Sequence, residues 1–240
     1  MKEASLEYSI VGNDIQLVEI ILAPGETVIA EAGAMIYVDS GISFDAKMGD
    51  GSRANQSMLN KLVTVGKRVV SGESIFMTHF TNETTEQRRV SFAAQTAGKV
   101  IPVDLSGISG DLICQKDCFL AAELGTILDV AFVKRLGVGI FGGEGFTLQK
   151  LNGDGMAFIN AGGTVVERRL DNDKIVVGTG CIVAFESGIS YEIQRAGKLK
   201  STLFGGEGIF LATLSGTGRV WVQSLPFSRL ADRIMGVLNN

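Results

Sequence analysis

A five-residue block, Phe-Gly-Gly-Glu-Gly, occurs in this chain at residues 141–145 and again at residues 204–208. A diverged copy, Ser71-Gly72-Glu73, lies earlier in the chain. Similar blocks at long, regular spacing indicate a chain built from repeats of one structural unit. Three such repeats restrict the possible folds more narrowly than any other property of the sequence.

The distances between landmarks repeat as well. A glycine that follows a strand-like segment lies 18 residues before the glycine that precedes the repeated glutamate in two copies (125 to 143 and 188 to 206). In the first copy the same distance is 31 residues (41 to 72). The first copy therefore contains an insertion, which we place at 50–70. Matching unit ends at 98–105 and 163–170 predict three units, 1–105, 106–170 and 171–240. Units this small are expected to share cores or sheet edges.

The composition favours strands joined by tight turns. The 240 residues include 31 glycines and only 3 prolines, and the glycines lie among short runs of Val, Ile, Phe and Thr. We therefore predict an all-β protein of three tandem β-sandwich or short double-stranded β-helix modules. Two segments depart from this pattern and predict helices, the insertion at 50–70 and the tail at 224–238, where Ser228 is a suitable cap.

Each predicted helix has two interpretations. The insertion has apolar residues at helical spacing and an excess of basic residues, so it either caps the β core or docks on a partner protein or an acidic membrane surface. We favour the cap. The tail places Leu230, Ile234 and Leu238 on one side, and this side packs either on its own chain or on a neighbouring copy.

The net charge argues against nucleic acid as a partner. The chain has 22 basic and 26 acidic residues, a formal charge of −4, whereas nucleic-acid binding depends on neutralising phosphates with Lys and Arg. No apolar run is long enough to span a bilayer, and the first residues do not resemble a secretory signal. We expect a cytoplasmic protein.

The repeated glutamates are the strongest candidates for binding. Glu73, Glu144 and Glu207 each follow a glycine, Gly143 and Gly206 in the two exact copies. Converging carboxylates could bind a hard cation, or their crowding could raise one pKa enough for acid–base chemistry. The alternative is that glycines with positive φ require a turn at each site and each glutamate pairs locally. We favour the turn, and expect no metal or cofactor.

No other residues form a recognisable catalytic group. Cys114, Cys118 and Cys181 are an odd number of thiols, and we expect them to be structural, with Cys114 and Cys118 on one face of one strand. The one histidine, His79, lies in an apolar segment, where a packed histidine is more common than a catalytic one. Trp221 is expected in the core of the last unit. We therefore predict no catalytic residues and a protein that is not an enzyme.

Three segments carry a resemblance to a known family: Glu31-Ala-Gly-Ala-Met-Ile-Tyr37, the two Phe-Gly-Gly-Glu-Gly blocks, and Leu225-Pro-Phe-Ser-Arg-Leu-Ala-Asp-Arg-Ile234. They resemble the bacterial and archaeal relatives of the mitochondrial-biogenesis ("altered inheritance of mitochondria") proteins, a domain of unknown function. The resemblance implies a fold like the tryptophan RNA-binding attenuation protein, three modules per chain, and a homotrimer whose nine modules close a ring. It implies no catalytic residues, and RNA binding is not transferred with the fold.

Three function classes remain open. The first, which we favour, is a ring-forming scaffold or binding protein without catalytic activity. The second is an enzyme, or a protein that binds a small ligand or metal, using the repeated glutamates. The third is a peripheral membrane-associated organising protein that attaches through residues 50–70 or the tail.

Overall fold

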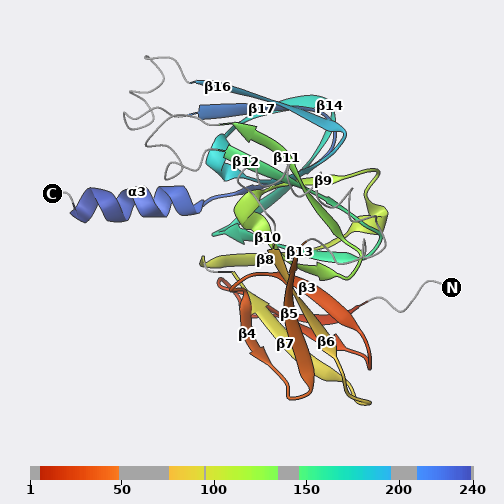
Figure 1. The fold of residues 1–240 in the computed structure, drawn as a ribbon. Coiled ribbons are helices and arrows are strands. Elements are labelled where there is room, and N and C mark those ends of the chain that lie inside the picture. The colour runs from red at the N-terminus through yellow and green to blue at the C-terminus, as the bar shows by residue number, and fades with distance from the viewer. Residues whose placement is uncertain (1–5, 49–75, 95, 135–145, 196–209, 239–240) are drawn as a thin grey trace.

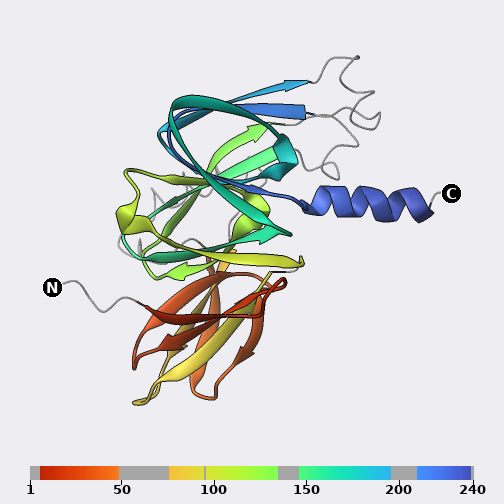
Figure 2. The same cartoon turned by 180° about the vertical axis from the view of Figure 1, so that it is seen from behind.

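The structure is a computed structural model that describes residues 6–48, 76–94, 96–134, 146–195 and 210–238 (Figures 1 and 2). The predicted insertion at 50–70 and all three glycine–glutamate blocks lie outside these ranges. Within them the chain forms antiparallel sheets, short 3-10 turns and one α-helix at the C-terminal end. The predictions of an all-β protein and of a C-terminal helix are therefore confirmed.

The strands form three sheets. The first has the order β1-β2-β7-β4, from β1 (Glu7–Val11), β2 (Leu17–Leu22), β7 (Arg88–Ala93) and β4 (Met35–Val38). The second has the order β5-β6-β3-β10-β13-β8, from β5 (Ile42–Met48), β6 (Phe76–Asn82), β3 (Thr27–Glu31), β10 (Phe119–Glu123), β13 (Met156–Gly162) and β8 (Gly98–Asp104).

The third sheet has the order β11-β12-β9-β15-β17-β14, from β11 (Ile127–Lys134), β12 (Phe146–Asn152), β9 (Leu112–Gln115), β15 (Ile182–Glu186), β17 (Phe210–Gln223) and β14 (Val165–Gly178). Strand β16 (Ile189–Arg195) also pairs with β17. The 3-10 turns are η1 (Leu105–Gly107), η2 (Lys116–Cys118) and η4 (Thr179–Cys181), and α3 (Phe227–Leu238) follows the last strand.

The sheets are held together by three hydrophobic clusters. The alternation of side chains along a strand explains how one face is buried: in β2, Val18, Ile20 and Leu22 are fully buried. They pack between the first and second sheets, and another cluster fills the space between the second and third sheets. The last cluster lies where the third sheet curls onto itself around β14 and β17 (Figure 1). Trp221 is buried, as predicted.

The strand pairing occurs three times along the chain. The pairs β4–β7, β10–β13 and β15–β17 each have a register shift at the corresponding residue, after Met35, Phe119 and Ile182. The pairs β5–β6, β11–β12 and β16–β17 correspond in the same way, as do β2–β7, β8–β13 and β14–β17. In the last of the three repeats, the long strands β14 and β17 each take the place of two successive strands of the other repeats.

The predicted unit boundaries do not separate independent sheets. Residue 170 lies inside β14, and the second sheet combines strands from both sides of residue 105. The division at 105 and 170 remains a prediction about the sequence repeat.

One local prediction is wrong. Cys114 lies in β9, but Cys118 belongs to the 3-10 turn η2, so the two thiols do not share a strand. Both are buried free thiols, and His79 is buried in β6.

Candidate functional site

The residues that the sequence singled out for binding are not placed. Glu73, Glu144, Glu207, Gly143 and Gly206 all lie outside the described residues. Whether the glutamates converge, and whether the glycines make turns, therefore stay predictions. The candidate site described below is built from other residues.

A different set of carboxylates repeats within the described chain. Each stands two residues before a repeated glycine, and each accepts a hydrogen bond from a backbone N–H of the neighbouring strand. The three bonds run from Arg89 N to Asp39 Oδ2 (2.8 Å), from Met156 N to Glu123 Oε1 (2.9 Å) and from Arg219 N to Glu186 Oε2 (3.0 Å). They satisfy a donor where each strand pairing ends, so their role is structural. The pattern Asp/Glu-x-Gly was visible in the sequence, but we did not single it out.

Consecutive repeats are joined through strand edges at two junctions with the same geometry. In the first, β3 pairs with β10, and Ala30 lies opposite Ala121. In the second, β9 pairs with β15, and Cys114 lies opposite Ala184. All four of these residues are fully buried. A strand of one repeat thus completes the sheet of the next repeat in each case.

The same two strand positions are open at the ends of the chain. β4 corresponds to β10 and β15, and the second half of β14 (residues 173–178) corresponds to β3 and β9. Both β4 and β14 end their sheets without a further strand among the described residues. We call these two strands the open edges.

Apolar side chains at the open edges are exposed where their counterparts in the internal junctions are buried. Val176 on β14 is 61% exposed, whereas its counterpart Ile29 on β3 is 0% exposed. Ile36 on β4 is 55% exposed, whereas its counterpart Leu120 on β10 is 1% exposed. Unpaired apolar strand edges promote association with another chain.

Comparison with known proteins supplies the family. The family model described as Mitochondrial biogenesis AIM24 matches residues 8–225. The chain belongs to this AIM24 family. The resemblance noted in the sequence is therefore confirmed over most of the chain.

Two relatives of this AIM24 family chain come from Streptococcus pyogenes. An uncharacterised protein of serotype M6 is 28% identical over 221 residues, which cover 91% of this chain and 85% of that protein. The crystal structure of another S. pyogenes protein matches with a TM-score of 0.72 and 23% identity, over 97% of this chain and 99% of that one. The latter likeness supports the fold.

A polar cluster lies beside one open edge of the AIM24 family chain. The Tyr37 hydroxyl on β4 donates a hydrogen bond to Glu19 on β2, and Glu19 Oε1 lies 3.4 Å from Arg89 Nε. The bond to the carboxylate raises the pKa of Tyr37, because it stabilises the protonated phenol. This cluster fixes the position of the Tyr37 side chain at the open edge of β4.

Glu31, at the end of β3, has an altered acidity at the first junction. Glu31 is an exposed residue by surface area, yet neighbouring atoms desolvate its carboxyl group and raise its pKa to about 7. Asp117 adds to the increase, and Lys116 opposes it. The proton uptake of this group therefore depends on the packing of β3 against the next repeat.

Three further observations concern the thiols, metal binding and membrane-spanning helices. Burial raises the pKa of the Cys114 and Cys118 thiols, so both remain protonated near neutral pH. Within the described ranges, no group of three or more His, Cys, Asp or Glu side chains is arranged to hold a metal ion. In the same part of the chain, no helix has the length and apolar character needed to cross a bilayer.

Proposed function

We propose that this AIM24 family chain is a non-catalytic scaffold that assembles head to tail into a closed ring of identical copies. In this assembly β4 of one copy pairs with the second half of β14 in the preceding copy. The supporting observation is that two internal junctions use these strand positions, while the same positions are open and apolar at the two ends of the chain.

The internal junctions also predict the register of the pairing between copies. The pairs Ala30–Ala121 and Cys114–Ala184 occupy the same position in the two internal junctions. In the contact between copies, this position is taken by Val177 of one copy and Tyr37 of the next. Val176 then lies opposite Val38, and both side chains turn toward the neighbour's second sheet. The register places apolar residues against each other in these two pairs, and the next pair sets Asp39 opposite Ile175, as Glu123 lies opposite Val28 in the first junction.

A head-to-tail contact either closes into a ring or continues as a filament. Each chain carries three repeats of the pairing scheme, and the family resemblance implies nine modules per ring. We therefore propose a homotrimer. In such a ring the open edges are all paired, which removes the tendency of exposed strands to aggregate.

The test is the molar mass of the purified protein, measured by mass photometry and sedimentation velocity over a wide concentration range. The expected result is a discrete species with three times the mass of the 25.5 kDa chain. A monomer at every concentration, or open-ended polymers, would contradict the proposal. Metal analysis of the same sample tests the rival proposal that the repeated glutamates hold a cation.

Helix α3 favours a second candidate function, peripheral membrane association. The helix projects away from the sheets (Figures 1 and 2), and Ile234, Met235 and Val237 on it are exposed. An amphipathic helix with an uncovered apolar side can lie in a membrane interface. Co-sedimentation with liposomes, compared with a chain that ends at residue 226, tests this candidate.

A further inference from the structure

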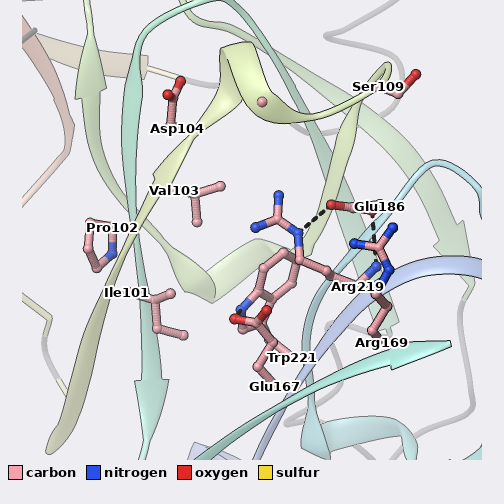
Figure 3. A pocket seen from close by; sticks show the side chains of 11 residues that line it. Ile101, Pro102, Val103, Asp104, Ser109, Glu167, Arg169, Glu186, Arg219 and Trp221 are labelled. Carbon is pink, nitrogen blue, oxygen red and sulfur yellow. Dashed lines mark hydrogen bonds and ion pairs between the residues drawn. The ribbon is translucent and has the colours of Figure 1, made fainter.

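A cavity of about 470 Å³ lies between the second and third sheets (Figure 3). One wall is formed by Ile101, Pro102 and Val103 of β8, and the other by residues of β14 and β17 that include Trp221. This volume lies within the range of small-molecule binding sites. No residue that we selected from the sequence as a binding candidate lines it.

Two arginines stand side by side in this cavity. Arg169 on β14 lies directly opposite Arg219 on β17, so both side chains are on the same face of the sheet. Like charges directly opposite each other in an antiparallel pair are destabilising. Such a pair requires negative charge close to it.

Glu186 compensates only part of this charge. Its Oε1 lies 2.6 Å from Arg219 Nε, and its Oε2 accepts the Arg219 backbone N–H at 3.0 Å. The guanidinium of Arg219 also lies over the Trp221 ring, at 5.1 Å from the centroid. In Figure 3 the terminal nitrogens of Arg219 are directed away from Glu186, into the cavity. Among the described residues Arg169 makes no ion pair.

The other carboxylates that line the cavity already have partners within the chain. Glu167 Oε2 accepts the Trp221 Nε1–H bond at 3.0 Å. Asp104 Oδ1 accepts the backbone N–H and the hydroxyl of Ser106, at 2.9 and 2.6 Å, at the start of η1. Arg169 and the terminal nitrogens of Arg219 are the charged donors in the lining for which no partner is found among the described residues.

The equivalent space between the first and second sheets shows how this site differs. There the counterparts of Trp221, Arg219 and Arg169 are Phe158, Met156 and Asp104. The ring of Tyr8 on β1 packs edge-on against Phe158, with centroids 4.9 Å apart. The chain thus fills this first space with its own aromatic side chain, and it leaves the second space open with two arginines in it.

An added peptide strand is a poor occupant of the second space. β1 reaches the first space by pairing with the outer edge of β2. On the outer edge of β8, Val100 N–H is already bonded to Gln16 Oε1 at 3.0 Å, and Pro102 has no N–H to offer. A proline on an edge strand opposes further strand pairing.

We propose that this cavity binds a small amphipathic anion, a carboxylate or phosphate monoester that carries a short hydrocarbon chain. The guanidinium groups of Arg169 and Arg219 hold the anionic group, as planar guanidinium donors match carboxylate and phosphate oxygens. The hydrocarbon portion lies against Ile101, Pro102 and Val103. This proposal does not depend on the ring, because all the residues it uses belong to one chain.

Trp221 gives a local signal for the test, because it is the only tryptophan in the chain. Its fluorescence is followed while the wild-type protein is titrated with hexanoate and with hexyl phosphate. Inorganic phosphate and hexanol serve as controls that carry only one half of the proposed ligand. We expect a saturable change with hexanoate, hexyl phosphate or both, and at least tenfold weaker binding of the two controls.

Two variants on the same strand complete the experiment. Arg169→Ala is expected to weaken binding at least tenfold, whereas Arg168→Ala, which removes an exposed arginine on the opposite face of β14, should leave it unchanged. Both positions are exposed, so both variants should keep the wild-type melting temperature. Binding of only one probe identifies the preferred head group. Failure of both probes at millimolar concentration, or equal effects of the two substitutions, would overturn the proposal.

Discussion

The substitution Val176→Lys tests the pairing of the open edges. In the isolated chain this side chain is 61% exposed, so a lysine there should change the free energy of unfolding of one chain by less than about 0.5 kcal/mol. In the proposed ring the same position would be covered by the neighbouring copy, as Ile29 is buried in the first junction and Ile113 is partly buried in the second. Val176→Lys therefore separates assembly from folding.

The size of the effect follows from the cost of burying an unpaired charge. An ammonium group that loses its water without gaining a partner costs several kcal/mol after relaxation. Taking about 3 kcal/mol for each contact between copies, the dissociation constant of each contact rises roughly 100-fold. We expect Val176→Lys to convert the oligomer largely into monomers at concentrations where the wild-type protein is fully assembled.

Sedimentation velocity over a concentration series measures this shift, with circular dichroism as a check on the fold. Leu124→Lys is the matched control, because Leu124 is 51% exposed in a turn and corresponds to serines, Ser40 and Ser187, in the other two repeats. It should assemble like the wild type. The reasoning would be refuted if Val176→Lys assembled as tightly as Leu124→Lys.

Two further predictions concern the core and the first junction. Phe158→Ala should lower the free energy of unfolding by about 3–5 kcal/mol in chemical denaturation, because Phe158 is fully buried under Tyr8, whereas Phe44→Ala, at a ring that is 57% exposed, should cost far less. Similar losses for both would contradict the packing. The Glu31 carboxyl, with a pKa of about 7, holds a proton that the unfolded chain releases near pH 4.5, so its contribution to stability is lost as pH rises through this window. The melting temperature of Glu31→Gln should therefore exceed that of the wild type increasingly from pH 4.5 to pH 7.5, and a constant difference would rule out this assignment.

Much of the architecture was predictable because it depends on local chemistry. Alternating apolar residues mark strands such as β2, and the equal spacing of Gly125 and Gly188 from later glycines indicates the repeat. The amphipathic pattern of residues 224–238 predicted the terminal helix, but the helix begins at Phe227, so Ser228 lies inside it and is not its cap. These features depend on residues close together in the sequence.

The sharing of sheets between repeats could not be derived in the same way. Nothing in the alternation of β3 distinguishes a partner within its own repeat from β10, which lies about 90 residues later. The expectation of a strand at Cys118 is wrong for a related reason, since the turn η2 interrupts an otherwise strand-like run. Long-range pairing and local interruptions are decided by packing, not by the period of the pattern.

The candidate sites show the same limit. The acid before each repeated glycine was present in the sequence at Asp39, Glu123 and Glu186, but its hydrogen bond is visible only once the opposing strand is placed. The cavity beside Arg169 arises because β8 lacks the strand that β1 provides for β2, and a missing neighbour leaves no mark on the residues themselves.

The register between copies can be measured directly by disulfide trapping. Tyr37→Cys and Val177→Cys are combined in a chain that also carries Cys181→Ser. Substitution by cysteine is expected to be tolerated, because the corresponding positions hold Ala121, Ala184, Ala30 and Cys114. The predicted result is covalent oligomers of up to three chains after mild oxidation, which disappear on reduction. The account would be contradicted if Tyr37→Cys with Val177→Cys gave no cross-link, or if Val38→Cys with Val177→Cys, one residue out of register, cross-linked equally well.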